Sequence, residues 1–162
     1  MHQINTMIRI FTSTLLCILA FSGCKNQPVA DLGPDEVLYF ETVGMGHNGS
    51  LRDTTEVVFS ESSAFQAAVS ELNLLGPIAN VDFSQTMVGF IAIPTESGGY
   101  IIQVKSVEKT GNEIVVSYEF SKPGQDCVTI QALSLPFQIV KIKRSEGVVR
   151  FKRIEKQYSC SL

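Results

Sequence analysis

The sequence has no tryptophan, only two histidines and four cysteines in 162 residues, and 18% of its residues are charged. Soluble domains usually carry about 25% charged residues. Two histidines leave little material for a multi-histidine metal site or for Ser-His or Cys-His catalysis. The formal net charge of −3 argues against a generally basic nucleic-acid binder, and the 44% of hydrophobic residues argue against a disordered chain. The length suits one domain.

Residues 1–23 have the pattern of a bacterial export signal. Arg9 is the single charge, and a mostly apolar run extends from Ile10 to Phe21. A membrane-spanning helix needs about 20 apolar residues, so this shorter run fits the hydrophobic region of a secretory signal. Met7 is an alternative start, because the segment that begins there is a complete signal by itself.

The end of this segment predicts a lipid anchor. Phe21-Ser22-Gly23-Cys24 resembles the bacterial lipobox, in which a bulky apolar residue and two small residues precede the cysteine that is acylated. Phe21 stands where leucine is commoner, and ordinary cleavage after Gly23 is the alternative. Several acyl chains would hold Cys24 stably on a membrane. By resemblance to enteric sorting rules, Lys25 in place of aspartate suggests the outer membrane.

The remaining cysteines predict a disulfide. Cys17 leaves with the signal and Cys24 carries the lipid, so Cys127 and Cys160 remain. An even number of cysteines in an oxidising compartment favours a bridge, and two separate thiols are the alternative.

After a tether over residues 24–36, residues 37–162 read as a single β-rich domain. Apolar alternation and strand-forming residues predict seven strands. One helix is predicted from the spacing of Phe65, Ala68, Val69 and Leu72. We expect Ser62 or Ser63 to cap this helix, which runs to about Asn73. The expected strands are Val37–Val43, Thr54–Phe59, Thr86–Ile93, Tyr100–Glu108, Glu113–Phe120, Leu133–Lys143 and Val148–Ile154.

Short spacers between successive strands favour antiparallel neighbours, with Leu133–Lys143 and Val148–Ile154 as a final hairpin. The fold class is therefore mostly β (α+β), an antiparallel sheet or a sandwich-like domain with one covering helix. Thr86–Ile93 is almost wholly apolar, which predicts a central strand buried on both faces.

One glycine-rich stretch literally matches a dinucleotide fingerprint. Gly44-Met45-Gly46-His47-Asn48-Gly49 spells G-x-G-x-x-G after a strand, but no helical pattern follows to hold a pyrophosphate. We therefore expect a hairpin loop there and a solvated His47. No catalytic residue, metal site or cofactor is predicted.

Charge is unevenly distributed along the chain. Acidic residues predominate before Tyr100 and basic residues after it. On a final hairpin, the basic residues could meet anionic headgroups or an acidic partner. The favoured interpretation is that they protect a sheet edge from aggregation. They are Lys141, Lys143, Arg144, Arg150, Lys152, Arg153 and Lys156.

Four short motifs occur in one order within residues 80–142. They are Val81-Asp82-Phe83, Ser97-Gly98-Gly99-Tyr100, Pro123-Gly124-Gln125-Asp126-Cys127, and Gln131-Ala132-Leu133-Ser134-Leu135-Pro136-Phe137. This ordered set resembles the PrcB C-terminal domain family, named for an accessory lipoprotein of a surface protease complex. Ser97 and Leu135 depart from the family pattern.

The motif residues also have structural explanations. Asp82 can turn the chain into a strand, and Gly98-Gly99 can form a two-residue hairpin turn. Tyr100 can bury its ring while its hydroxyl stays wet, and Pro136 suits a strand start. We expect these roles to be mainly structural.

The resemblance implies a non-catalytic accessory subunit, anchored in the cell envelope, that binds another envelope protein such as a protease. Two alternatives stay open. One is a protease inhibitor that inserts loops such as Thr95–Tyr100 or Gly44–Ser50 into a cleft, and the other is a small-ligand-binding envelope protein.

Overall fold

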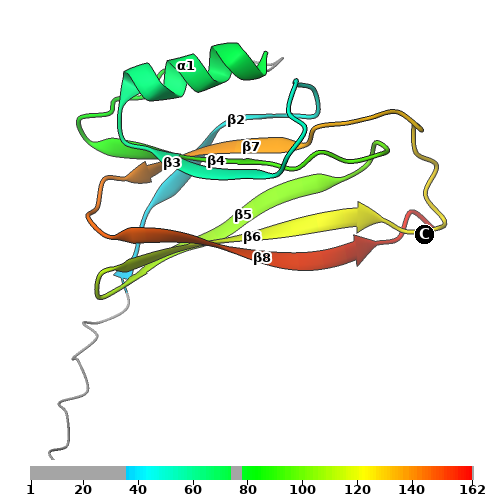
Figure 1. The fold of residues 1–162 in the computed structure, drawn as a ribbon. Coiled ribbons are helices and arrows are strands. Elements are labelled where there is room, and N and C mark those ends of the chain that lie inside the picture. Colours follow the sequence, from blue (N-terminus) through cyan, green and yellow to red (C-terminus); the bar gives the residue numbers. More distant parts are fainter. Residues whose placement is uncertain (1–35, 74–77, 162) are drawn as a thin grey trace, which may run out of the picture.

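The computed structural model describes residues 36–73 and 78–161, and it shows a β-sandwich covered by one helix (Figure 1). Sheet A has the strand order β1-β5-β6-β8, and sheet B has the order β2-β7-β4-β3. The predicted mostly β fold with one covering helix is confirmed. The predicted signal and most of the tether lie outside the described residues. No helix in the described ranges is long and apolar enough to cross a membrane.

The elements have the following bounds. Sheet A contains β1 (Glu36–Val37), β5 (Ile101–Thr110), β6 (Glu113–Pro123) and β8 (Val148–Tyr158). Sheet B contains β2 (Phe40–Gly46), β3 (Thr55–Phe59), β4 (Thr86–Ala92) and β7 (Phe137–Lys143). The helix α1 covers Ser62–Leu72.

Strand β4 is buried on both faces, as its apolar sequence predicts. Met87 and Ile91 face the core between the sheets, whereas Val88 and Phe90 face the core beneath α1. Because the side chains of a strand alternate between faces, a strand between two apolar layers needs apolar residues at every position.

Helix α1 packs on the outer face of sheet B. Phe65 is its buried anchor, and its ring centroid lies 5.6 Å from that of Phe59 and 5.9 Å from that of Phe83. The predicted serine cap is wrong, since Glu61 is the N-cap residue and makes no side-chain cap hydrogen bond. The helix ends at Asn73, whose left-handed φ of 45° satisfies the usual C-terminal cap geometry.

Three predictions of local pairing are wrong, because at these places strands that follow one another in the sequence are not neighbours in a sheet. The expected strand Val37–Val43 is divided, with β1 in sheet A and β2 in sheet B, and Leu38 is buried where the chain crosses. Strands β2 and β3 form opposite edges of sheet B, so Gly44–Gly49 is not a hairpin loop. Strands β7 and β8 do not pair, because β8 lies parallel to β6 over its whole length.

The expected basic hairpin therefore does not exist, and its cations are divided between the two sheets. Arg144 donates hydrogen bonds to the backbone carbonyls of Ser60 and Phe83 and so ties the loop after β7 to the segments flanking α1. Most of the other cations form ion pairs, namely Lys141–Glu41, Lys143–Glu36, Arg150–Glu113, Arg153–Glu155 and Lys156–Glu119.

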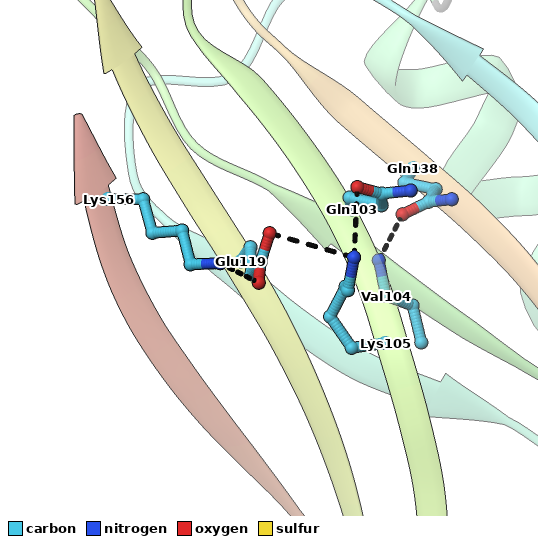
Figure 2. A network of polar contacts seen from close by, with 6 residues as sticks. All are labelled: Gln103, Val104, Lys105, Glu119, Gln138 and Lys156. Atoms are coloured by element: carbon cyan, nitrogen blue, oxygen red, sulfur yellow. Dashed lines mark hydrogen bonds and ion pairs between the residues drawn. The ribbon is translucent and has the colours of Figure 1, made fainter. Parts of the chain in front are cut away.

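One buried polar side chain joins the sheets. Gln138 of β7 points into the core, where its Oε1 accepts a hydrogen bond from the Val104 backbone N–H of β5 at 2.7 Å (Figure 2). Its Nε2 donates to Thr42 Oγ1 of β2 at 2.8 Å. A register shift between Val104 and Ser106 interrupts the β5–β6 ladder at this point. The glutamine thus satisfies a backbone donor where β5 is irregular.

Candidate interaction surface

The loops after β4, β6 and β8 meet at one end of the sandwich. The segment between β6 and β7 crosses from sheet A to sheet B and carries Cys127, which is joined to Cys160 by a disulfide. The predicted bridge is therefore present, with a Cα–Cα distance of 5.1 Å. It fastens the crossing segment to the residues that follow β8.

The Gly98-Gly99 turn lies against this crossing segment. Gly98 N–H donates to Ile130 O at 2.9 Å, and the Tyr158 hydroxyl donates to Gly99 O at 2.7 Å. Gly99 has a φ of +89°, and a Cβ at this position would lie 3.1 Å from Thr129 Cγ2. Of the two glycines only Gly99 has a positive φ, and the predicted hairpin turn is wrong, because the turn links β4 of sheet B to β5 of sheet A.

A carboxylate fixes the other side of the crossing segment. Asp126 Oδ2 accepts hydrogen bonds from the Ser159 hydroxyl, the Cys160 N–H, and both the N–H and the hydroxyl of Ser161, all at 2.7–2.9 Å. The Ser159 hydroxyl and then the Ser161 donors lower the pKa of Asp126. Charged acceptors make the stronger hydrogen bonds, so the residues after β8 are held firmly.

Despite this restraint, the crossing segment exposes large apolar side chains. Val128 is fully exposed, Leu133 is 88% exposed and Ile130 is 76% exposed. We call Val128, Ile130 and Leu133 the apolar loop surface. A loop that is already ordered loses little conformational freedom when it binds, and exposed apolar clusters often mark interaction sites.

The other motif residues lie in the fold and not on this surface. Asp82 Oδ1 accepts from the Ser84 N–H at 2.9 Å and the Ser84 hydroxyl at 2.7 Å, which turns the chain into β4 and lowers the pKa of Asp82. Val81 and Phe83 pack beneath α1. Pro136 is fully buried directly before β7, where its carbonyl accepts from the Ile93 N–H.

Tyr100 connects the turn to the core. Its ring stacks on Phe120 with a centroid distance of 5.3 Å and packs against the core between the sheets. This position supports the expectation that the ring is largely covered. The conformation of the turn and the packing of the aromatic residue after it are therefore coupled.

The glycine-rich stretch borders the same end of the molecule. The carbonyl oxygen of His47 accepts from the Leu135 N–H at 2.9 Å and from the Ser134 hydroxyl at 3.2 Å, while the His47 side chain is exposed. The next element is strand β3, so the helix that a dinucleotide fingerprint requires is not there. Among the described residues, no group of three or more His, Cys, Asp or Glu could hold a metal ion.

The three residues of the apolar loop surface were not predicted from the sequence. Leu133 was expected in a strand, and Val128 and Ile130 were given no role, because strand-forming residues near a buried strand are usually part of it. The signal that could have separated them from β7 is Pro136, which has no backbone N–H and suits the residue at the start of a strand.

Comparison with known proteins identifies the central part of the chain. Residues 87–143 match the family model described as PrcB C-terminal. The resemblance inferred from the sequence motifs is thus confirmed. The match runs from β4 through β7, so the PrcB C-terminal segment includes the Gly98-Gly99 turn and the whole apolar loop surface. No curated protein and no solved structure gave a significant match to the chain.

Proposed function

We propose that this protein is a non-catalytic accessory lipoprotein of the bacterial cell envelope that binds another envelope protein through the apolar loop surface. The observation that carries the proposal is the combination of exposed Val128, Ile130 and Leu133 with a backbone that hydrogen bonds and a disulfide hold in place. The PrcB C-terminal match supports an association with a protease complex.

The direction in which the chain enters the sandwich supports this function. Glu36 of β1 pairs with Lys109 near the end of β5, whereas Ile101 at the start of β5 lies beside the apolar loop surface. Ten strand residues span roughly 30 Å. A chain anchored through Cys24 would therefore present the apolar loop surface at the end away from its point of attachment.

The alternative of an inhibitor that inserts a loop into a protease has less support from the geometry. Thr95 pairs with Ser134 through two backbone hydrogen bonds of 2.8 and 3.0 Å, and Gly98 is bonded to Ile130. The turn therefore lies on the crossing segment and does not project as a free loop.

Site-specific cross-linking in native membranes tests the proposed function. A photo-reactive amino acid at position 128 or 133 should yield a discrete adduct with one envelope protein. The same group at position 148, where Val148 is 58% exposed at the opposite end of β8, is the matched control. Equal labelling from all three positions, or none from 128 and 133, would contradict the proposal.

The lipid anchor needs a separate test. Replacing Cys24 with serine should move the protein from the membrane fraction to the soluble fraction, and mass spectrometry of the native protein should find a diacylglyceryl group on Cys24. Membrane association that survives Cys24→Ser, together with an unmodified N-terminal peptide, would disprove the anchor.

A further inference from the structure

Two hollows beside the apolar loop surface adjoin each other. The first, of about 660 Å³, and the second, of about 540 Å³, share His47, Asn48, Leu133 and Ser134 as lining residues. Because they have these residues in common, the two hollows adjoin each other at the end of the sandwich. We call the pair the loop groove.

One end of the loop groove is apolar. Gly98, Gly99, Ile101, Ile130 and Leu133 line it. Two backbone polar groups there are already satisfied, since Gly98 N–H donates to Ile130 O and Gly99 O accepts from the Tyr158 hydroxyl. This end therefore offers carbon surface to a ligand and few free hydrogen-bonding groups.

The other end of the loop groove carries a cation. Arg52 is exposed and lines the larger hollow, and it forms no ion pair with any described residue. No aspartate or glutamate is found among the described residues that line either hollow. Arg52 thus differs from the ion-paired cations of the two sheets, and its planar guanidinium suits a carboxylate.

The wall between the two ends is rigidly connected. The His47 carbonyl accepts from both Leu135 N–H and the Ser134 hydroxyl, and Ser134 is paired in turn with Thr95. The segment that carries Arg52 and the crossing segment that carries Leu133 are therefore held side by side at His47. A ligand that contacts both ends would find them already positioned, which lowers the entropic cost of binding.

We propose that the loop groove binds an extended peptide segment of the partner, with a large apolar side chain over the Gly98-Gly99 end and a carboxylate at Arg52. This inference rests on the proposed function and specifies the chemistry of the partner. The carboxylate belongs either to an aspartate or glutamate side chain or to a free C-terminus, since Arg52 would recognise both in the same way.

Synthetic peptides test this recognition directly on the full chain purified in mild detergent. Random dodecapeptides displayed on phage supply the sequences, and fluorescence anisotropy then measures binding of amidated peptides with an acidic residue and of neutral peptides with a free C-terminus. We expect enriched sequences that combine a large apolar residue with a carboxylate. Comparison of the two kinds of peptide shows whether the carboxylate is that of an acidic side chain or that of a free C-terminus. Absence of enrichment, or enrichment without a carboxylate, would overturn the inference.

Two variants with matched controls locate the binding. Arg52→Ser should weaken peptide binding about tenfold, whereas Lys152→Ser, which removes another exposed cation, should leave it unchanged. Leu133→Asp should weaken it at least as much, whereas Val148→Asp should not. Peptide binding that is insensitive to Arg52→Ser overturns the assignment of the charged end. If cross-linking from position 133 still captures the partner in that case, the proposed function stands while this inference fails.

Discussion

Gln138 and Val104 connect the two sheets by a hydrogen bond of 2.7 Å from the Val104 backbone N–H to the Gln138 side chain. Gln138 is 3% exposed, and it is the only buried polar or charged residue in the described ranges. An amide side chain in an apolar core is costly unless its donors and acceptors are satisfied. Here the side chain meets β5 with its oxygen and β2 with its nitrogen, so three strands depend on it.

Gln138→Leu should therefore lower the free energy of unfolding by roughly 1–3 kcal/mol, because the Val104 donor would stay buried without an acceptor. Gln103→Leu is the matched control, since Gln103 is exposed and its side-chain oxygen accepts a hydrogen bond from Lys105 (Figure 2). Urea denaturation measures both changes. Equal loss of stability in the two variants would show that the buried hydrogen bond has no special importance.

A second polar contact crosses the sandwich. The buried Tyr118 hydroxyl of β6 donates a hydrogen bond to the Glu56 carboxylate of β3. Tyr118→Phe should cost roughly 1–2 kcal/mol of stability, and Tyr39→Phe, at a 69% exposed position, should cost almost nothing. Chemical denaturation at neutral pH provides the comparison.

The same contact predicts sensitivity to alkali. Burial, and then the hydrogen bond to Glu56, raise the pKa of Tyr118. The unfolded chain ionises this tyrosine near pH 10, while the folded chain keeps it neutral. The stabilisation is fully present below that pH and is lost as the pH rises further. Between pH 9 and 11, the free energy of unfolding should decrease less steeply with pH for Tyr118→Phe than for the unaltered protein. Parallel dependences on pH would contradict the prediction.

The two glycines of the turn should respond differently to alanine. Gly99→Ala should destabilise the domain by about 1–2 kcal/mol or more, because its φ is +89° and the new Cβ would crowd Thr129. A Cβ at Gly98 would have its nearest neighbour at 3.8 Å, an ordinary contact, so Gly98→Ala should be almost neutral. Thermal denaturation should separate them, and similar melting temperatures would show that the turn is not constrained.

Acid should loosen the end of β8 before the rest of the domain. The hydrogen bonds from Ser159 and Ser161 lower the pKa of Asp126 in the folded protein. The ionised carboxylate therefore stabilises the fold at pH values above the unfolded pKa of about 3.9, and this stabilisation is lost as the pH falls through the folded pKa. Asp126→Asn should remove this dependence. Amide hydrogen exchange at residues 159–161, measured at pH 5 and pH 3, is the direct observable. The same change in exchange between the two pH values in the unaltered protein and in Asp126→Asn would refute the prediction.

Removing the disulfide should make the backbone that carries the apolar loop surface more mobile and leave the rest of the fold largely unchanged. Cys127→Ser with Cys160→Ser deletes a link between residues 33 apart in the sequence, which fastens the crossing segment to the residues after β8. Hydrogen exchange should rise in residues 124–134 and stay unchanged in α1. A uniform rise throughout the domain would mean that the bridge stabilises the whole sandwich.

The positions of most strands could be predicted from the sequence, apart from the division of Val37–Val43 and the start of β7 at Phe137, but the way they are shared between the sheets could not. The alternating side chains of Ile114, Val116 and Tyr118 are all buried, as their period of two indicates. Periodicity reports which face of a strand is covered and does not name its neighbour. Strand β8 therefore looked like a partner of β7, because the spacer between them is short, although it lies beside β6.

The candidate site was harder to predict for a related reason. Asp82, Gly99 and Pro136 have local roles that follow from their residue types, and the structure places each in such a role. The loop groove depends on contacts between segments far apart in the sequence, such as His47 with Leu135. Nothing in the local pattern around either residue indicates that contact.

The parallel pairing of β8 with β6 has a consequence for biosynthesis. Strand β7, in the other sheet, separates the two strands, so sheet A is complete only when the chain as far as Tyr158 is available. Pairings between distant segments form slowly. During synthesis, the edge of β6 stays unpaired until β8 is available, and we expect chains shortened before Tyr158 to be prone to aggregation and proteolysis.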